Sequence, residues 1–153
     1  MSEYKLIEEI ISRSDAKTWD EAKLEWYLEE VYREDEPDTC LCDHYPINEI
    51  CILRNVHNGN RAMVGNVCVK KFLGLPSDRI FQAIRRVRAD EQKALNAEAI
   101  DHAHIHGWIT DWEREFYFDT MRKQSLSEKQ MKKRLQVNRK ILQRVINTFR
   151  NRP

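Results

Sequence analysis

The sequence predicts a mainly α-helical domain that carries a small zinc-stabilised β-hairpin insert. Four glycines and four prolines among 153 residues are few, which favours long helices over frequent turns. Apolar residues recur at helical spacing on both sides of a segment that contains all four cysteines. The length fits a single domain. Within it we expect acidic N-terminal helices over residues 1–36, a zinc knuckle and hairpin over 37–74, and C-terminal helices over 75–153.

The composition excludes several classes of protein. Uninterrupted apolar runs reach only about four residues, as in Ile50–Leu53, whereas a membrane-spanning helix needs about 20. The first residues lack the basic start and apolar stretch of a signal peptide. Four Trp, five Tyr and five Phe can anchor a core, so disorder over the whole chain is not expected. We therefore expect a cytoplasmic globular protein without a membrane partner.

Two helices are predicted before the cysteines. Apolar residues at helical spacing predict the first over residues 3–12, with Ser2 as its N-cap. A capping box at Thr18–Glu21 predicts a second helix that extends to about Arg33. The apolar residues that define its faces are Trp19, Ala22, Leu24, Trp26, Leu28 and Val31.

All four cysteines lie between positions 40 and 68, as Cys40, Cys42, Cys51 and Cys68. Disulfides are rare in the cytoplasm, and Cys40 and Cys42 are too close in sequence for an ordinary unstrained bridge. Zinc prefers four sulfur or nitrogen ligands in a tetrahedron, and a tight turn can bring two thiolates onto one ion. The clustering therefore predicts a Zn²⁺ site rather than a set of small buried thiols.

The segment between the first cysteines and Cys68 predicts a β-hairpin. Residues 50–56 are rich in strand-forming residues, Asn58-Gly59 is a turn signal, and residues 61–64 can return antiparallel. One helical turn is expected at 69–73. This order of knuckle, hairpin and helix start resembles a treble-clef zinc site.

The helix of a treble-clef site usually supplies two ligands spaced Cys-x-x-Cys, and Lys71 stands here at the second of these positions. The predicted ligands are therefore Cys40, Cys42 and Cys68 together with His44, which follows the knuckle by two residues. Cys51 is the alternative fourth ligand.

Several short motifs in and around the cysteine segment form a wider pattern. They are Cys40-Leu41-Cys42, Asn55–Gly59 and Val64–Phe72, with flanks at Trp19–Trp26, Gly107–Glu113 and Leu126–Gln130. This pattern resembles one found in small, uncharacterised phage and mobile-element proteins, and the similarity covers most of the chain. It implies a metal site and a bacterial host cell, and it implies no particular reaction. Asp43 stands where that pattern has glycine.

Four helices are predicted after the cysteines. The first begins at Ser77, and the second covers residues 97–106 and ends at Gly107. Capping boxes at Thr110–Glu113 and Ser127–Gln130 open the third and fourth. The predicted apolar seam of the last helix is Met131, Leu135, Asn138, Leu142, Val145 and Phe149.

A charge gradient makes the last helix a candidate for nucleic-acid binding. Residues 1–43 contain 5 basic and 14 acidic side chains, whereas residues 121–153 contain 11 basic and 1 acidic. Basic side chains on such a helix can neutralise phosphates. The candidate contacts are Lys132, Lys133, Arg139, Lys140 and Arg144. Alternatively, the basic helix folds back on the acidic N-terminal helices.

Three further clusters have weaker functional interpretations. His102 and His106 share a helix face with His104 nearby, but such histidines are more often a solvated helix end than a second metal site. A patch of Lys70 and Lys71 with three arginines of the following helix could face phosphate, although a solvated face is the simpler reading. Those arginines are Arg85, Arg86 and Arg88.

The sequence favours a non-enzymatic function. It contains neither a phosphate-cradling glycine-rich loop nor a nucleophile elbow. A Cys51–His57 nucleophilic pair is conceivable, but metal binding explains the thiols better. We therefore expect a zinc-binding accessory protein that binds nucleic acid. The alternative is a protein-binding adaptor or an inhibitor of a host enzyme.

Overall fold

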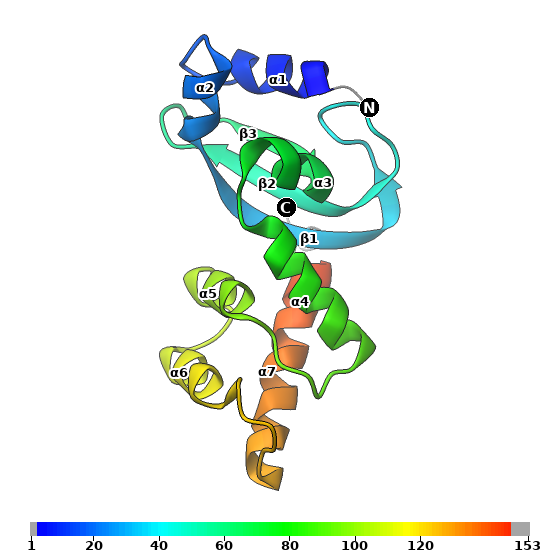
Figure 1. Cartoon of the computed structure of the whole chain (residues 1–153), viewed down its shortest axis with the longest axis vertical. Coiled ribbons are helices and arrows are strands. Elements are labelled where there is room, and N and C mark those ends of the chain that lie inside the picture. The colour runs from blue at the N-terminus through cyan, green and yellow to red at the C-terminus, as the bar shows by residue number, and fades with distance from the viewer. Residues whose placement is uncertain (1–2, 148–153) are drawn as a thin grey trace. The chain divides into compact units, whose positions relative to one another are not determined.

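The computed structural model describes residues 3–147, which divide into two compact units with the boundary between Asp78 and Arg79 (Figure 1). The first unit contains a three-stranded sheet and several short helical segments. Its strands are β1 (Trp26–Asp38), β2 (Ile47–Asn55) and β3 (Arg61–Gly65). Its helical segments are α1 (Glu3–Ser12), α2 (Trp19–Ala22), a 3₁₀ turn (Lys23–Glu25), α3 (Asn66–Cys68) and a π-helical turn (Val69–Leu73).

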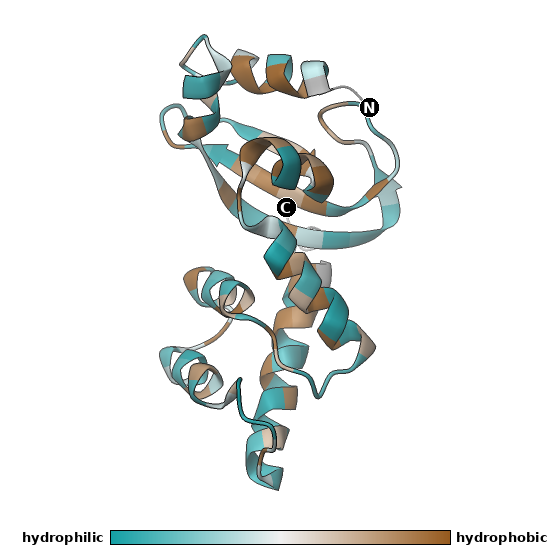
Figure 2. Cartoon of the chain, viewed as in Figure 1, coloured by the Kyte–Doolittle hydropathy of each residue, from teal (hydrophilic) through white to brown (hydrophobic). Residues whose placement is uncertain are grey.

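The second unit is helical. Its elements are α4 (Ser77–Ala89), which begins at the end of the first unit, α5 (Ala97–Ile105), α6 (Asp111–Thr120) and α7 (Glu128–Asn147). Figure 2 shows hydrophilic and hydrophobic residues alternating around these helices, as expected for amphipathic packing. None of the helices in residues 3–147 is long and apolar enough to cross a membrane.

The fold class predicted from the sequence is wrong. The chain has a mixed α/β fold with a three-stranded antiparallel sheet in the order β1-β2-β3, rather than a mainly α-helical fold with a small hairpin insert. The predicted helix over residues 19–33 survives only as α2 and the 3₁₀ turn. From Trp26 the chain is instead the longest strand of the sheet, antiparallel to β2.

Pairing with β2 explains why β1 is a strand. Its residues Val31 and Tyr32 are buried opposite Cys51 and Ile50 of β2. Packing between the two strands therefore outweighs the helical spacing of the apolar residues. The register shifts between Leu28 and Glu30. Such a bulge interrupts the two-residue alternation by which a strand is recognised in a sequence.

The predicted hairpin is confirmed as β2 and β3, and the predicted helical turn follows it as α3 and the π-helical turn. The turn at Asn58-Gly59 closes with the Asn55 amide donating to the Asn60 carbonyl at 2.8 Å. Gly59 has φ 75°, which glycine adopts without strain. Below this turn, one cluster of apolar side chains spans all three strands. It consists of Tyr32, Ile50 and Ile52, with Ile47 and Met63 packed against them.

A buried carboxylate joins the N-terminal segment to the hairpin. Glu25 accepts hydrogen bonds from the Asp15 and Ala16 amides at 2.9 and 2.8 Å, and from Asn55 Nδ2 at 2.9 Å. The hydrogen bond from Asn55 is the main reason that the pKa of Glu25 lies below its ordinary value. Asn55 Oδ1 in turn accepts from the amide of His57 at the hairpin turn. Asn55 therefore holds both the carboxylate and the turn.

The second unit has a polar cluster at its centre, beside α7. Tyr117 donates to Asn138 Oδ1 at 2.6 Å and accepts from the Leu95 amide at 2.8 Å. Asn138 Nδ2 donates to the carbonyls of Glu91 and Lys93. All the polar groups of these side chains are thus satisfied, which makes their burial tolerable.

The predicted seam of α7 is partly wrong. Val145 and Asn138 are buried as predicted, but Met131, Leu135 and Leu142 are only half-buried. The other buried positions among the described side chains of α7 are Arg134, Val137 and Ile141. Burial therefore follows a face rotated from the predicted one, and the guanidinium of Arg134 on that face hydrogen-bonds to the Gln92 and Thr120 carbonyls. Phe149 lies outside the described residues.

Most of the helix boundaries are confirmed. The capping boxes at Thr110–Glu113 and Ser127–Gln130 both form, and Gly107 follows α5 with φ 72°. At the start of α2, in contrast, the Thr18 side chain makes no capping hydrogen bond. Ser2, the predicted cap of the first helix, lies outside the described residues.

We expect Asn55→Ala to lower the free energy of unfolding by about 2–3 kcal/mol, because Glu25 would lose a buried partner and the turn amide an acceptor. Urea denaturation at pH 7 measures this change. Asn60→Ala serves as the control, because the exposed Asn60 side chain only donates to the Arg13 carbonyl. Equal losses in the two variants would contradict the role assigned to Asn55.

Candidate metal centre

The loop between β1 and β2 forms a tight knuckle that presents two cysteines. The Cys40 amide donates to the His44 carbonyl at 2.9 Å, and the Asp43 amide donates to the Cys40 carbonyl at 2.8 Å. Asp43 has φ 72°, a left-handed conformation that Asp tolerates better than most residues. The Asp43 carboxylate pairs with Lys5 on α1 at 2.7 Å, and Cys42 is fully buried.

The third cysteine comes from the end of the hairpin. β3 ends at Gly65, and α3 then begins at Asn66 and ends at Cys68. The Gly65 amide donates to Cys40 Sγ at 3.2 Å, which links the hairpin to the knuckle. A Cβ at Gly65 would lie 3.1 Å from Ile47 Cγ2, so a larger residue would press against the first residue of β2.

The three sulfur atoms have a spacing that suits one metal ion. The Sγ atoms of Cys40, Cys42 and Cys68 all lie within 4.8 Å of one another, and those of Cys42 and Cys68 are 3.4 Å apart. Around a tetrahedral ion with bonds of about 2.3 Å, sulfur ligands would be about 3.8 Å apart. All three residues are buried. These three cysteines could therefore hold a metal ion.

The charges of the thiols also favour a cation. A hydrogen bond from the Cys68 thiol is the main reason that the pKa of Cys40 lies well below its ordinary value. The same hydrogen bond raises the pKa of Cys68, with burial acting in the same direction. Without a cation, a thiolate disfavours the deprotonation of a second thiol close to it, because the two negative charges repel each other. A bound divalent ion would let all three deprotonate.

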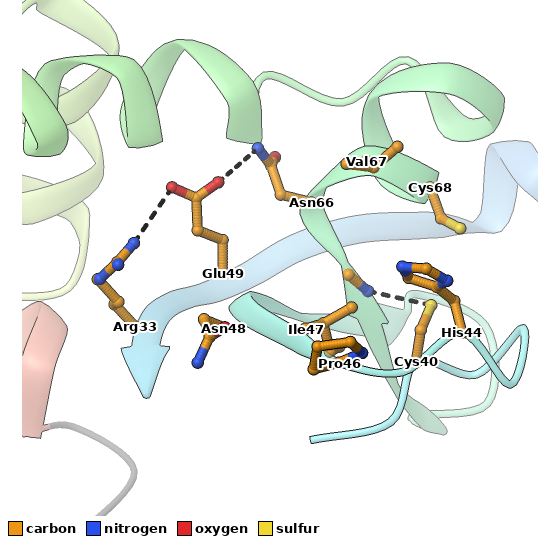
Figure 3. A pocket seen from close by; sticks show the side chains of 11 residues that line it. Arg33, Cys40, His44, Pro46, Ile47, Asn48, Glu49, Asn66, Val67 and Cys68 are labelled. Atoms are coloured by element: carbon orange, nitrogen blue, oxygen red, sulfur yellow. Dashed lines mark hydrogen bonds and ion pairs between the residues drawn. The ribbon is translucent and has the colours of Figure 1, made fainter. Parts of the chain in front are cut away.

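Figure 3 shows where the fourth predicted ligand lies. The imidazole of His44 is drawn beside the sulfur atoms of Cys40 and Cys68, and all three residues line one cavity of about 470 Å³. His44 is exposed. Among the described residues, the group of metal-ligating atoms within 4.8 Å of one another contains only the three cysteines. A rotation of the His44 side chain would be needed to complete that group.

Cys51, the alternative fourth ligand, has a different environment. It lies in β2 between Val31 and Val64 and is fully buried. Burial raises the pKa of its thiol to about 12, although a hydrogen bond with Ser77 acts in the opposite direction. A neutral thiol in a sheet packs as a small apolar side chain. His57, its conceivable catalytic partner, is exposed in the hairpin turn.

The far end of the same cavity is polar. Figure 3 shows Glu49 between Arg33 and Asn66, with an ion pair of 3.6 Å to Arg33 and a hydrogen bond of 3.4 Å from Asn66. Asn66 also donates to Asp78 and accepts from Ser77. These contacts fix the first turn of the helix that supplies the third cysteine. Asn66 is thus a positioning residue that the sequence analysis did not identify.

Several of the basic residues predicted to contact nucleic acid are in intramolecular ion pairs. Lys133 and Lys140 pair with the buried Glu113 at 3.1 and 2.8 Å, and Arg139 pairs with Glu91 at 2.7 Å. Lys132 and Arg144 are exposed, and Arg144 also has an interaction partner. The sequence predicted that these side chains contact either nucleic acid or the acidic N-terminal segment. Both of the acidic partners seen here, Glu91 and Glu113, instead lie in the second unit.

The arginines and lysines of the second predicted patch are dispersed among local contacts. Lys70 pairs with Asp78 at 3.3 Å, and Lys71 is exposed. Arg86 donates to the Ala94 carbonyl at 2.6 Å, while Arg85 and Arg88 are exposed on α4. The two lysines belong to the first unit and the three arginines to the second.

The three histidines near the end of α5 have separate roles. His102 is 8% exposed, and burial lowers its pKa to about 3, so it is neutral at pH 7. His104 pairs with Asp111 at 2.6 Å, and His106 Nδ1 lies 2.9 Å from the His102 carbonyl. His102 therefore packs in the core of its unit instead of forming part of a solvated helix end.

No protein-family model matches the chain, and no curated protein or solved structure matches it either.

We expect Glu113→Gln to remove part of the acid sensitivity of folding. Burial alone would raise the pKa of Glu113, but hydrogen bonds from Lys140, the Thr110 amide and Lys133 lower it to about 2. Because the folded pKa lies below the unfolded value of about 4.3, its stabilisation is present above that pH and is lost as the pH falls towards 2. The variant should lose about 2 kcal/mol at pH 7 and little at pH 2.

Urea denaturation at both pH values measures this difference. Glu115→Gln is the matched control, because Glu115 is exposed on the same helix. An unchanged pH dependence in Glu113→Gln would refute the role of the two lysine pairs.

Proposed function

We propose that the metal is Zn²⁺, held by Cys40, Cys42, Cys68 and His44. Zinc is the usual partner of a buried thiolate set completed by a histidine. The position of His44 beside two of the sulfur atoms supports it as the fourth ligand over Cys51, whose neutral thiol belongs to the sheet. In this role zinc joins the knuckle to the end of the hairpin and stabilises the first unit.

We further propose that the protein is a non-enzymatic accessory protein that binds nucleic acid. The observation that carries this proposal is the basic C-terminal region, with 11 basic and 1 acidic side chains over residues 121–153. Lys132 and Arg144 are exposed on α7, in keeping with phosphate contact. The buried, neutral thiol of Cys51 also argues against a cysteine nucleophile.

One observation favours the alternative of a protein-binding adaptor or an inhibitor of a host enzyme. The ion pairs of Lys133, Arg139 and Lys140 reduce the positive charge that α7 can offer to phosphate. The first unit also carries an acidic run at the end of β1, with Asp35 and Glu36 exposed. Such a surface suits a basic protein partner better than a nucleic acid.

We expect the purified protein to contain one zinc ion per chain. Cys40→Ser and Cys68→Ser should lose the metal and lower the thermal stability, because metal binding and folding are coupled in such sites. Elemental analysis by mass spectrometry, combined with thermal denaturation, measures both effects. Protein purified without zinc in stoichiometric amount would rule out this site.

Two single variants identify the fourth ligand. His44→Ala should lower the zinc affinity, whereas Cys51→Ala should keep the metal and lose only packing energy. The opposite result would assign the fourth position to Cys51. Triple replacement of His102, His104 and His106 by Ala should leave the zinc content unchanged.

We expect salt-dependent binding to DNA or RNA oligonucleotides. Fluorescence anisotropy at about 50 and about 200 mM salt should show affinity falling steeply, since each phosphate contact contributes a slope of about 0.7 to 0.9. Lys132→Gln should flatten this slope without loss of stability, because its side chain is exposed. Absence of binding to both single and double strands at low salt would favour the adaptor or inhibitor.

A further inference from the structure

A pair of stacked aromatic rings, the exposed Trp112 and the half-buried Phe116, borders a groove between α6 and the start of α7, within the second unit. Trp112 is 60% exposed. Its ring lies 5.5 Å from that of Phe116, with the two planes only 13° from parallel. The groove has a volume of about 470 Å³, within the roughly 300–1,000 Å³ of small-ligand sites. Phe116 thus covers part of the indole, and the exposed part of the Trp112 ring borders the groove, where a flat partner can contact it.

Positive charge lines the α7 side of this groove. Lys129, Lys132 and Lys133 line the groove, and its described lining includes no carboxylate. Lys133 Nζ lies 5.4 Å from the centre of the Trp112 ring. The ion pair with the buried Glu113 holds that lysine in place. Lys129 and Lys132 are exposed. The groove thus combines an aromatic platform with cations.

We infer that this groove binds single-stranded nucleic acid, with a base stacked on Trp112 and the adjoining phosphates contacted by Lys129 and Lys132. The inference rests on the proposed nucleic-acid function and adds the site and the form of the ligand. Stacking on a side chain requires a base whose face is free, as in a single strand, whereas the faces of paired bases are covered.

The surrounding charges also define the path of the strand. Glu115 and Asp119 are exposed on α6 and would repel phosphate. The lysines lie on α7, so the sugar–phosphate backbone should follow α7 while the base points towards α6. Gln130 and Gln136 also line the groove and offer amide groups to the edge of a stacked base.

The test compares the protein of residues 1–153, purified with its bound metal, with Trp112→Ala and Trp112→Phe. Fluorescence anisotropy measures binding to a labelled mixed-sequence strand of about 12 nucleotides, as DNA and as RNA, and to the matching duplex. We expect the single strand to bind more tightly than the duplex. Trp112→Ala should weaken single-strand binding about tenfold, and Trp112→Phe should restore most of it.

Two controls separate stacking from general effects. Ile105→Ala changes another exposed apolar residue of the same unit, which is 78% exposed, and should leave binding unchanged. Lys129→Gln should reduce the salt slope of single-strand binding by about 0.7. Circular dichroism and thermal unfolding verify that each variant keeps its fold.

The possible failures are distinguishable. Salt-dependent binding that Trp112→Ala leaves unchanged, or a preference for duplex, overturns this inference and retains the proposed function. Absence of binding to any nucleic acid overturns both. Competition by an acidic peptide as effective as that by the oligonucleotide, and equally sensitive to Trp112→Ala, overturns the inference in favour of a protein partner.

Discussion

Three sulfur atoms within 4.8 Å of one another in a buried site repel one another once more than one of them loses its proton. The protein brings them together nonetheless, by a turn at Cys40–Cys42 and a short helix that ends at Cys68. The amide of Gly65 donates a hydrogen bond to Cys40 Sγ and so stabilises negative charge on that one sulfur atom. The close approach of knuckle and hairpin is thus most stable with a cation between them, and the cavity beside His44 depends on that approach.

The local features of the first unit could be predicted from the sequence because short-range chemistry determines them. Asn58-Gly59 specifies the hairpin turn, and the spacing of the cysteines specifies the knuckle. The strand β1 could not be predicted, since its bulge breaks the alternation and its pairing partner lies beyond the knuckle. The sequence ranked His44 above Cys51 as the fourth ligand only from its nearness to the knuckle, because the side of the sheet that Cys51 faces depends on strand pairing.

The basic charge of α7 could be predicted from the sequence, but its ion-pair partners could not, because they are distant along the chain. Its charge was evident, but the carboxylates that pair with it, Glu91 and Glu113, come from a loop and from α6. The sequence identified Glu113 only as a capping residue, a role it also fulfils. On α6, Tyr117 is fully buried in the core, whereas Trp112 is 60% exposed. A stripe of aromatic residues does not reveal which members face solvent.

The distances along the chain between the partners in the first unit affect how it folds. β2 and β3 are joined by a short turn, whereas Cys42 and Cys68 are 26 residues apart. Closing a longer loop costs more chain entropy before any contact is gained. The hairpin is therefore expected to form early and the knuckle to join it late. Metal binding would then fix the knuckle to an already folded hairpin. The rate at which the ion binds would therefore set the rate of the last folding step.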